Sequence, residues 1–253
     1  MSSFRFKQFD IEQDNSAMKV NTDGVLLGAW MSISGTGRSL LDVGTGSGVI
    51  ALMAAQRIIA GGFSSSFHIT AIDIDRESLK DAAANFANSS FCSDKLQIEA
   101  KCIPLQELSG VKYDLIFSNP PYFINSLKAA EESRSNARHT DTLSQAELIK
   151  ASMDLLKPGG RLALVLPATE GEQFLSKVSF LEEQYHKSFG LALHLSRLCR
   201  VHTTIKKPAK RWLMEFVFSI EKPLVEESEL IMMSDGNFTS QYKSLTKDFY
   251  LNF

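Results

Sequence analysis

The stretch SLLDVGTGSGVIAL at residues 39–52 combines an apolar strand, a glycine-rich turn and an apolar helix. Gly44, Gly46 and Gly48 let the backbone approach a ligand closely, and the helix that follows presents free N–H groups. A dinucleotide fingerprint would need glycine at position 49, where Val49 stands, and a P-loop would need Gly-Lys-Ser/Thr, which is absent. The stretch therefore predicts a nucleotide-cofactor loop in an α/β fold.

A second apolar strand over residues 68–74 ends in acidic residues about 30 positions after the glycine loop. An acidic side chain at this place binds ribose hydroxyls in doubly wound folds, and we assign that role to Asp73. Asp75 is expected to cap the helix that follows, which continues through Phe86. A lone aspartate is usually only a helix cap, but here the strand, the spacing and the glycine loop coincide.

The corner Ser118-Asn119-Pro120-Pro121-Tyr122 follows an apolar run over residues 113–117. Each proline fixes its own φ and holds the residue before it extended, so the corner is stiff. Asn119 offers a side-chain acceptor, Pro120 a backbone carbonyl, and Tyr122 a ring on which a planar base could stack. The simpler interpretation is a rigid turn at the end of a buried strand of alternating Val111, Tyr113, Leu115 and Phe117.

The other elements complete an alternating α/β order. Residues 4–9 predict a short half-buried strand or hairpin, and Thr22 or Asp23 is expected to cap an apolar helix. Further strands are expected at 96–102, 161–166, 189–201 and 212–220, and helices at 143–156, which stops at Lys157-Pro158-Gly159-Gly160, and at 171–185. The last two strands suit an antiparallel pair at a sheet edge. The order predicts a doubly wound α/β sheet with right-handed crossovers.

These motifs together resemble the class I S-adenosylmethionine-dependent methyltransferases. The run Asp-x-Gly-x-Gly-x-Gly from Asp42 is similar to their cofactor loop, and the resemblance places Asp42 near the ammonium and ribose side of the cofactor. It implies a Rossmann-like, seven-stranded sheet with an antiparallel terminal pair. The acidic residue that often contacts the cofactor adenine after the third strand is missing, because Lys101-Cys102 stands there with Glu99 and Glu107 nearby.

The corner at residues 118–122 resembles the Asn-Pro-Pro-Tyr signature of amino-methyltransferases. Together with residues 21–30 and the end Phe249-Tyr250-Leu251, it resembles the bacterial adenine-N6 methyltransferases of valine tRNA. That family implies adenine 37 of tRNA as substrate. The resemblance makes Asn119, Pro120 and Tyr122 the catalytic set, with the adenine taken out of its stack. Residues 1–30 would close over the methionine end of the cofactor, and Asp23 and Asn119 join the candidate cofactor contacts.

Substrate contacts are expected in two polar segments. Residues 124–142 predict a long loop or weak helix beside the site, with Arg138 and His139 as candidate contacts. The connection between the last two strands is locally basic, and a phosphate-binding patch and lysine protection of an edge strand explain it equally well. The cations concerned are Arg197, Arg200, Lys206, Lys207, Lys210 and Arg211.

Composition sets the remaining expectations. The 253 residues have 44% hydrophobic and 22% charged side chains and a net charge of −2, so nucleic acid would be bound by a local patch rather than a global basic field. No apolar run reaches the roughly 20 residues that span a bilayer, so we expect a cytoplasmic protein. Three scattered cysteines indicate neither a disulfide framework nor a metal site. We expect one methyltransferase domain over 1–253, with a cofactor-closing segment at 1–30, a Rossmann-like core at 31–220 and a packed tail at 221–253.

Other functions remain open from the sequence. Methylation of a glutamine side-chain amide in a protein uses a similar corner on a similar fold, and guanine-N2 methylation of ribosomal RNA is a neighbouring possibility that Tyr122 disfavours. An RNA-binding assembly factor without turnover is the alternative outside the enzymes. The intact set of Asp42, Asp73 and Asn119 favours an enzyme.

Overall fold

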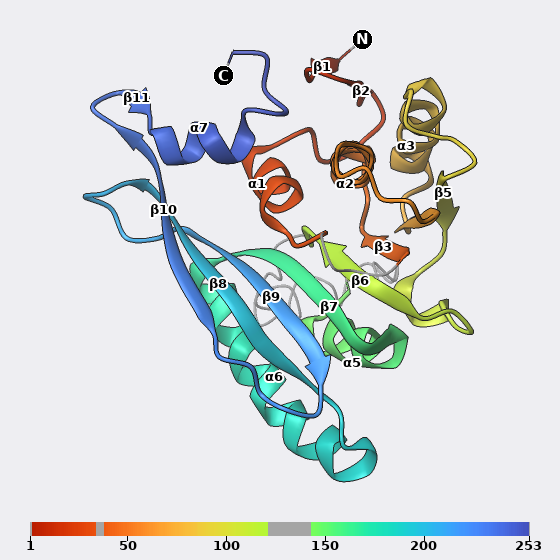
Figure 1. Cartoon of the computed structure of the whole chain (residues 1–253), viewed down its shortest axis with the longest axis vertical. Coiled ribbons are helices and arrows are strands. Elements are labelled where there is room, and N and C mark those ends of the chain that lie inside the picture. Colours follow the sequence, from red (N-terminus) through yellow and green to blue (C-terminus); the bar gives the residue numbers. More distant parts are fainter. Residues whose placement is uncertain (1, 34–37, 121–142, 253) are drawn as a thin grey trace, which may run out of the picture.

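A computed structural model describes residues 2–33, 38–120 and 143–252. Its main sheet has the order β11-β10-β8-β9-β7-β6-β3-β4-β5 (Figure 1). The strands are β3 (Ser39–Val43), β4 (Phe67–Asp73), β5 (Leu96–Cys102), β6 (Tyr113–Ser118), β7 (Leu156–Pro167), β8 (Ala192–Thr204), β9 (Arg211–Ser219), β10 (Glu226–Ser234) and β11 (Asn237–Phe238). From β5 to β7 all neighbours are parallel, and β9 is antiparallel to both β7 and β8. The predicted seven-stranded sheet with its antiparallel pair is present, and β10 and β11 extend it.

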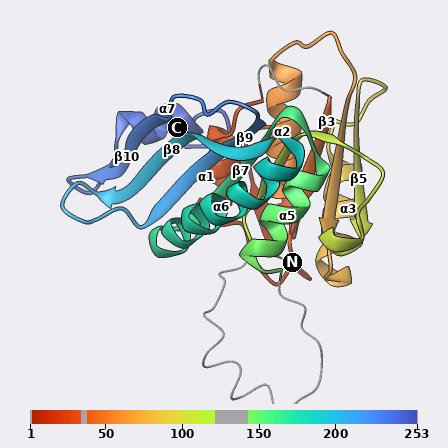
Figure 2. The ribbon, with the colours of Figure 1, turned by 90° about the horizontal axis from the view of Figure 1, so that it is seen from below.

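Alternating apolar side chains give the sheet two buried faces. Leu40, Leu115 and Ala163 belong to a core under α1 (Thr22–Trp30), α2 (Val49–Ala60) and α3 (Arg76–Asn88). Their neighbours Leu41 and Ile116 belong to a second core, under α5 (Gln145–Leu155) and α6 (Ala168–Phe189). Figure 2 shows α6 and α5 side by side on this second face. Helices therefore cover both sides of the sheet, as in a doubly wound fold.

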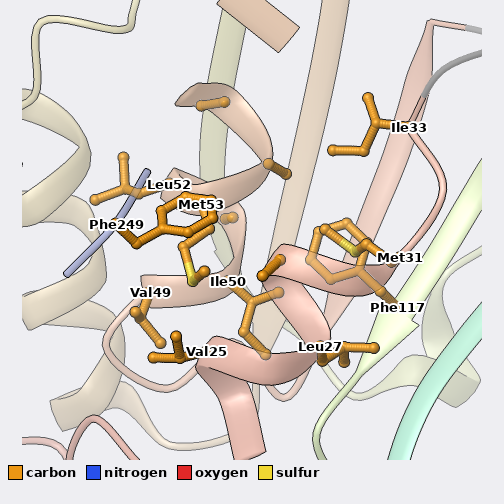
Figure 3. Packing of buried hydrophobic residues seen from close by; sticks show 14 of the residues in the cluster. Val25, Leu27, Met31, Ile33, Val49, Ile50, Leu52, Met53, Phe117 and Phe249 are labelled. Atoms are coloured by element: carbon orange, nitrogen blue, oxygen red, sulfur yellow. The ribbon is translucent and has the colours of Figure 1, made fainter. Parts of the chain in front are cut away.

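The helix α1 is buried almost all round, because it packs between α2 and the sheet. Val25 of α1 lies beside Val49 of α2, and Leu27 lies on the opposite side of α1 (Figure 3). Phe117 of β6 belongs to the same cluster. This packing places the amino end of α1 near the end of β6, where the Asn-Pro-Pro corner begins.

The N-terminal segment reaches α1 along α3. The strands β1 (Ser3–Arg5) and β2 (Asp10–Glu12) form the predicted hairpin. Beyond it, the Asp81 carboxylate accepts hydrogen bonds from the backbone N–H groups of Asn15 and Ser16, at 2.9 and 2.8 Å. Burial raises the pKa of Asp81, but the hydrogen bonds from Ser16 and Asn15 outweigh it and hold this pKa below its ordinary value. These bonds fix the route by which the chain arrives at the site.

Three predicted boundaries are wrong in detail. The N-cap of α1 is Asn21, whose Oδ1 accepts from the Gly24 N–H at 2.9 Å, rather than Thr22 or Asp23. Val111 lies before β6 and is 46% exposed, so the buried strand begins only at Tyr113. Residues 157–160 lie inside β7 rather than between helix and strand, because the pairing of β6 with β7 shifts register between Tyr113 and Leu115. The chain bulges there without leaving the sheet.

The pair formed by β8 and β9 is antiparallel as predicted, but it is not at the sheet edge. β10 pairs with β8 in parallel, and β11 and α7 (Ser240–Thr246) follow it. The two chain ends meet, since the Lys7 N–H donates to the Phe249 carbonyl at 2.8 Å, and both lie at the same end of the molecule in Figure 1. The segment after residue 220 therefore adds two strands, β10 and β11, to the sheet as well as a packed helix.

Candidate active site

The glycine loop between β3 and α2 forms a backbone cradle. Gly44 and Gly46 have φ values of +70° and +55°, and a Cβ on either would meet no atom within 4 Å. The loop is held from below, because the Gly44 and Thr45 N–H groups both donate to the Ile72 carbonyl of β4. The open space over two glycines fits a ligand that lies against the backbone.

Gly48 plays a different part from the other two glycines. Its φ is +82°, and a Cβ there would lie 2.5 Å from the Phe86 ring of α3. The third glycine is therefore required by close packing of α2 against α3, and its Cβ direction faces protein rather than the open cradle. The role of Gly48 as a cofactor contact stays a prediction.

Asp73 ends β4 beside this loop. Its Oδ2 accepts from the Gly46 N–H at 2.8 Å, and its Oδ1 accepts from the Asp75 N–H at 3.0 Å. Asp75 is the N-cap of α3 as predicted, accepting from the Glu77 and Ser78 N–H groups. The carboxylate of Asp73 thus lies at the rim of the glycine cradle, where the sequence predicted a ribose contact.

Asp42 lies under the loop and is fully buried. The Thr45 hydroxyl donates to its Oδ2 at 2.8 Å, while Oδ1 has no hydrogen-bond partner in the described part of the chain. Burial, with a smaller contribution from the charge of Asp73, raises the pKa of Asp42 to about 7. A buried acceptor without a partner is costly, so this atom is suited to a polar or cationic group of a ligand.

The Asn-Pro corner stands next to the glycine loop. The Ser118 hydroxyl donates to the Val43 carbonyl at 2.7 Å and joins the end of β6 to the end of β3. Asn119 is half-buried and Pro120 is buried. Since parallel strands end at one edge of the sheet, this pairing brings the corner and the cofactor cradle together.

The first turn of α1 lies beside Asn119, which the sequence did not predict in detail. A Cβ on Gly24 would lie 3.7 Å from Asn119 Nδ2, and the Met18 sulfur is 3.9 Å from the same atom. Asp23, predicted as a cofactor contact, accepts from Arg211 Nε at 2.7 Å. The sequence shows the Asn-Thr-Asp-Gly run at residues 21–24, but it does not predict which strand this run contacts.

The basic turn between β8 and β9 lies at the same edge of the sheet. Arg211 pairs with Pro167, the last residue of β7, so the turn projects from the carboxyl ends of the parallel strands. Lys206, Lys207 and Lys210 are exposed, and none is within 4 Å of a carboxylate in the part of the chain that the structure describes. Two of the six predicted cations lie elsewhere in ion pairs, because Arg197 and Arg200 pair with Glu226 and Glu227 of β10. Edge protection does not explain the lysines, since β8 is not an edge strand.

Other predictions lie outside or beside the site. Tyr122, Arg138 and His139 fall outside the described residues. Glu99 accepts from Lys101 and contacts His68, so this acidic side chain belongs to an ion-pair cluster within β4 and β5. The described ranges contain no cluster of three His, Cys, Asp or Glu side chains suited to a metal ion, and no described helix is long and apolar enough to cross a membrane. A cavity of about 530 Å³ lies away from the site, between the β1–β2 hairpin and the end of α3.

Proteins of known sequence show the family to which this chain belongs. The Methyltransferase small domain family matches residues 16–188. A tRNA1(Val) (adenine(37)-N6)-methyltransferase of Trichodesmium erythraeum is 40% identical over 100% of this chain and 99% of its own length. One of the same name from Vibrio campbellii is 39% identical over 98% of this chain and 95% of its own length.

Solved structures support the fold. A predicted O-methyltransferase of Agrobacterium tumefaciens superposes with a TM-score of 0.63 at 15% identity, over 90% of this chain and 96% of that one. A 16S rRNA N2 methyltransferase of T. thermophilus, solved with AdoMet and guanosine, gives 0.51 at 20% identity, over 85% and 49%. With glycine cradle, acidic strand end and Asn-Pro corner at one sheet edge, the chain belongs to the Methyltransferase small domain family, among the relatives that carry the name tRNA1(Val) (adenine(37)-N6)-methyltransferase.

Proposed function

We propose that this chain methylates the N6 amino group of an adenine in tRNA, at position 37 of valine tRNA, with S-adenosylmethionine as methyl donor. The observation that carries the proposal is the place of Asn119 and Pro120. They follow β6 directly, and Ser118 bonds them to the strand that ends in the glycine loop. The full-length relatives named for this reaction support the choice of base and of RNA.

The residues of the cradle fit the cofactor. Gly44 and Gly46 leave backbone surface open, and the Asp73 carboxylate is placed for ribose hydroxyls. The partnerless Oδ1 of Asp42 suits a donor or cation on the methionine side of the cofactor. S-adenosylmethionine supplies a methyl group that is made electrophilic by a sulfonium centre.

Asn119 and Pro120 act on the amino group. The side-chain oxygen of Asn119 and the carbonyl of Pro120 each accept a hydrogen bond from N6, and Tyr122 is assigned the stacking role by its sequence position alone. The two acceptors turn the nitrogen lone pair out of conjugation and stabilise the positive charge that develops on nitrogen. Positioning supplies most of the acceleration, and the departing proton is lost to water.

The RNA approaches the edge where these groups lie. Lys206, Lys207 and Lys210 form a short cationic turn at that edge and would neutralise backbone phosphates flanking the target base. Arg138 and His139 remain candidate contacts from their sequence positions. A tRNA substrate would place the protein in the cytoplasm.

The test is transfer of a radiolabelled methyl group to separate tRNA, ribosomal RNA and protein fractions from cells lacking the gene. Label recovered as N6-methyladenosine in tRNA is the expected result. Label in protein alone would identify a glutamine-amide enzyme, and N2-methylguanosine in ribosomal RNA the guanine alternative. Binding of tRNA without label in any fraction would identify a non-catalytic binder.

A further inference from the structure

The first turn of α1 forms one wall of the space around Asn119. Asn21 caps the helix, and a Cβ added at Gly24 would lie 3.7 Å from Asn119 Nδ2. Because Asn119 must aim an acceptor at the amino group, a shift of this wall would disturb the group most directly involved in the proposed reaction. The rate of the proposed reaction therefore depends on the position of α1.

Two side chains of β9 hold the two ends of α1. At the amino end, Arg211 Nε donates to Asp23 Oδ2 at 2.7 Å. Just past the carboxyl end, the Ser32 N–H donates to Glu215 Oε2 at 2.8 Å. Arg211 and Glu215 are four residues apart on one strand, hence on the same face and about 13–14 Å apart. Asp23 and Ser32 are nine residues apart, which is also about 13–14 Å along a helix.

The carboxyl end of α1 is held by several buried or half-buried contacts. Glu215 is fully buried, and Arg161 Nη1 donates to its Oε1 at 2.5 Å. Arg197 lies over the Trp30 ring and donates to the Ser32 hydroxyl, and Arg57 donates to the Gly28 and Met31 carbonyls. These positive charges also stabilise the carboxyl end of α1, where the helix dipole is negative. At the amino end, the ion pair of Arg211 with Asp23 ties the first turn of α1 to β9.

The Arg211 side chain points towards α1 and is mostly shielded from solvent. The side chains of Asp23 and Arg211 are only 17% and 29% exposed, and Arg211 Nη1 donates to the Lys210 carbonyl. We propose that Arg211 is a positioning residue, which holds the first turn of α1 against Asn119 through Asp23, and that the phosphate contacts of the basic turn belong to the lysines before it. This inference rests on the proposed function and revises the two roles that the sequence suggested for Asp23 and Arg211.

Kinetics with tRNA separate the two roles of Arg211. For Arg211→Gln we expect kcat to fall by about 10-fold or more, with the Kd for tRNA within about 2-fold of wild type. Lys207→Gln should instead raise the Kd for tRNA and reduce the slope of log K against log salt by about 0.9. Asp23→Asn should match Arg211→Gln, and the double variant should be no worse than either single variant, because the two residues act as one unit. Loss of tRNA affinity and salt slope in Arg211→Gln with unchanged kcat would overturn the proposal.

Hydrogen exchange gives a readout that does not depend on the substrate. In the ligand-free protein, Arg211→Gln should raise the exchange rates of the α1 amides at residues 24–26 by about 5-fold or more and leave α2 unchanged. Arg211→Lys, which keeps the charge, should lie between the two proteins. Lys80→Gln, which breaks the exposed ion pair with Glu77 on α3, is the matched control and should change neither exchange in α1 nor kcat. Unchanged exchange in α1 of Arg211→Gln would contradict the proposal. If the variant shows the expected exchange but the wild-type protein methylates no tRNA, the proposed function alone is refuted.

Discussion

The Asp73 carboxylate accepts a hydrogen bond from the Gly46 N–H at 2.8 Å, so the end of β4 holds the tip of the glycine loop. Its second oxygen is bonded to the Asp75 N–H, and both oxygens are thus oriented before a ligand arrives. An asparagine cannot accept two such bonds with both of its terminal atoms. We therefore expect Asp73→Asn to raise the Kd for S-adenosylmethionine by about 10-fold to 100-fold, measured by calorimetry.

Asp75→Ala is the control for that experiment. It removes the N-cap of α3 two residues away and should lower the free energy of unfolding by about 1 kcal/mol. The Kd for the cofactor should stay within about 2-fold, because the hydrogen bonds of the Asp75 side chain within the described residues all go to its own helix. Equal losses of affinity in both variants would mean that the loop, and not the Asp73 carboxylate, sets binding.

Asp42 makes stability depend on pH in an unusual direction. Its folded pKa of about 7 is above the ordinary 3.8, so its contribution to the free energy of unfolding is largest below pH 4 and is lost as pH rises through about 7. At pH 8, Asp42→Asn should therefore be more stable than wild type, by about 4 kcal/mol at most. The difference should shrink as pH is lowered towards 4, which urea titrations at several pH values measure.

The same variant should bind the cofactor more weakly at pH 8, because the charged acceptor is gone. Higher stability together with weaker cofactor binding is expected when a buried site residue lowers the free energy of unfolding but contributes to ligand affinity. A destabilised variant at pH 8 would show that Asp42 serves the fold through Thr45 instead.

Asn119→Ala should lower kcat by about 100-fold to 1,000-fold, as expected when an aimed acceptor is removed from the transition state. The side chain is half-buried and its only described hydrogen-bond contact is the long one to Met18, so the fold should be unaffected. Single-turnover rates with saturating cofactor, beside a thermal unfolding curve, measure both. Retention of full activity would remove Asn119 from the mechanism.

Glu215 tests the buried network behind α1. Glu215→Ala leaves Arg161 and Arg197 without their buried partner and should lower the free energy of unfolding by roughly 3–5 kcal/mol. Glu227→Ala, which removes the exposed partner of Arg200, should cost less than about 1 kcal/mol. Similar losses from the two substitutions would show that burial of Glu215 adds nothing to its ion pairs.

Local rules were enough for the parts of the site that are contiguous in sequence. The glycine loop, Asp73 at the end of its strand, and the Asn119 corner each carry their own geometry, because glycine, proline and strand ends constrain the backbone directly. The order of strands then followed from the order of motifs. The structure confirms these predictions of fold.

Long-range pairings were not predictable in the same way. Three neighbouring residues are suited to cap α1, namely Asn21, Thr22 and Asp23. Asn21 is the N-cap in the structure, whereas Asp23 bonds to Arg211, 188 residues away. The sequence makes Arg197 and Arg200 candidate phosphate contacts, because it predicts only a packed tail where β10 supplies their glutamate partners. A polar strand such as Glu226–Ser234 shows no strong apolar period, so its place beside β8 was not visible in the sequence.

The central claim is tested most directly by one nucleoside measurement. A valine tRNA transcript is incubated with the protein and S-adenosylmethionine, digested and analysed by mass spectrometry, beside a transcript that carries guanine in place of adenine 37. The account predicts N6-methyladenosine, close to one per tRNA, in the first transcript and none in the second. Methylation that persists in the second transcript would contradict the assignment of position 37, and its absence from both would contradict the proposed reaction.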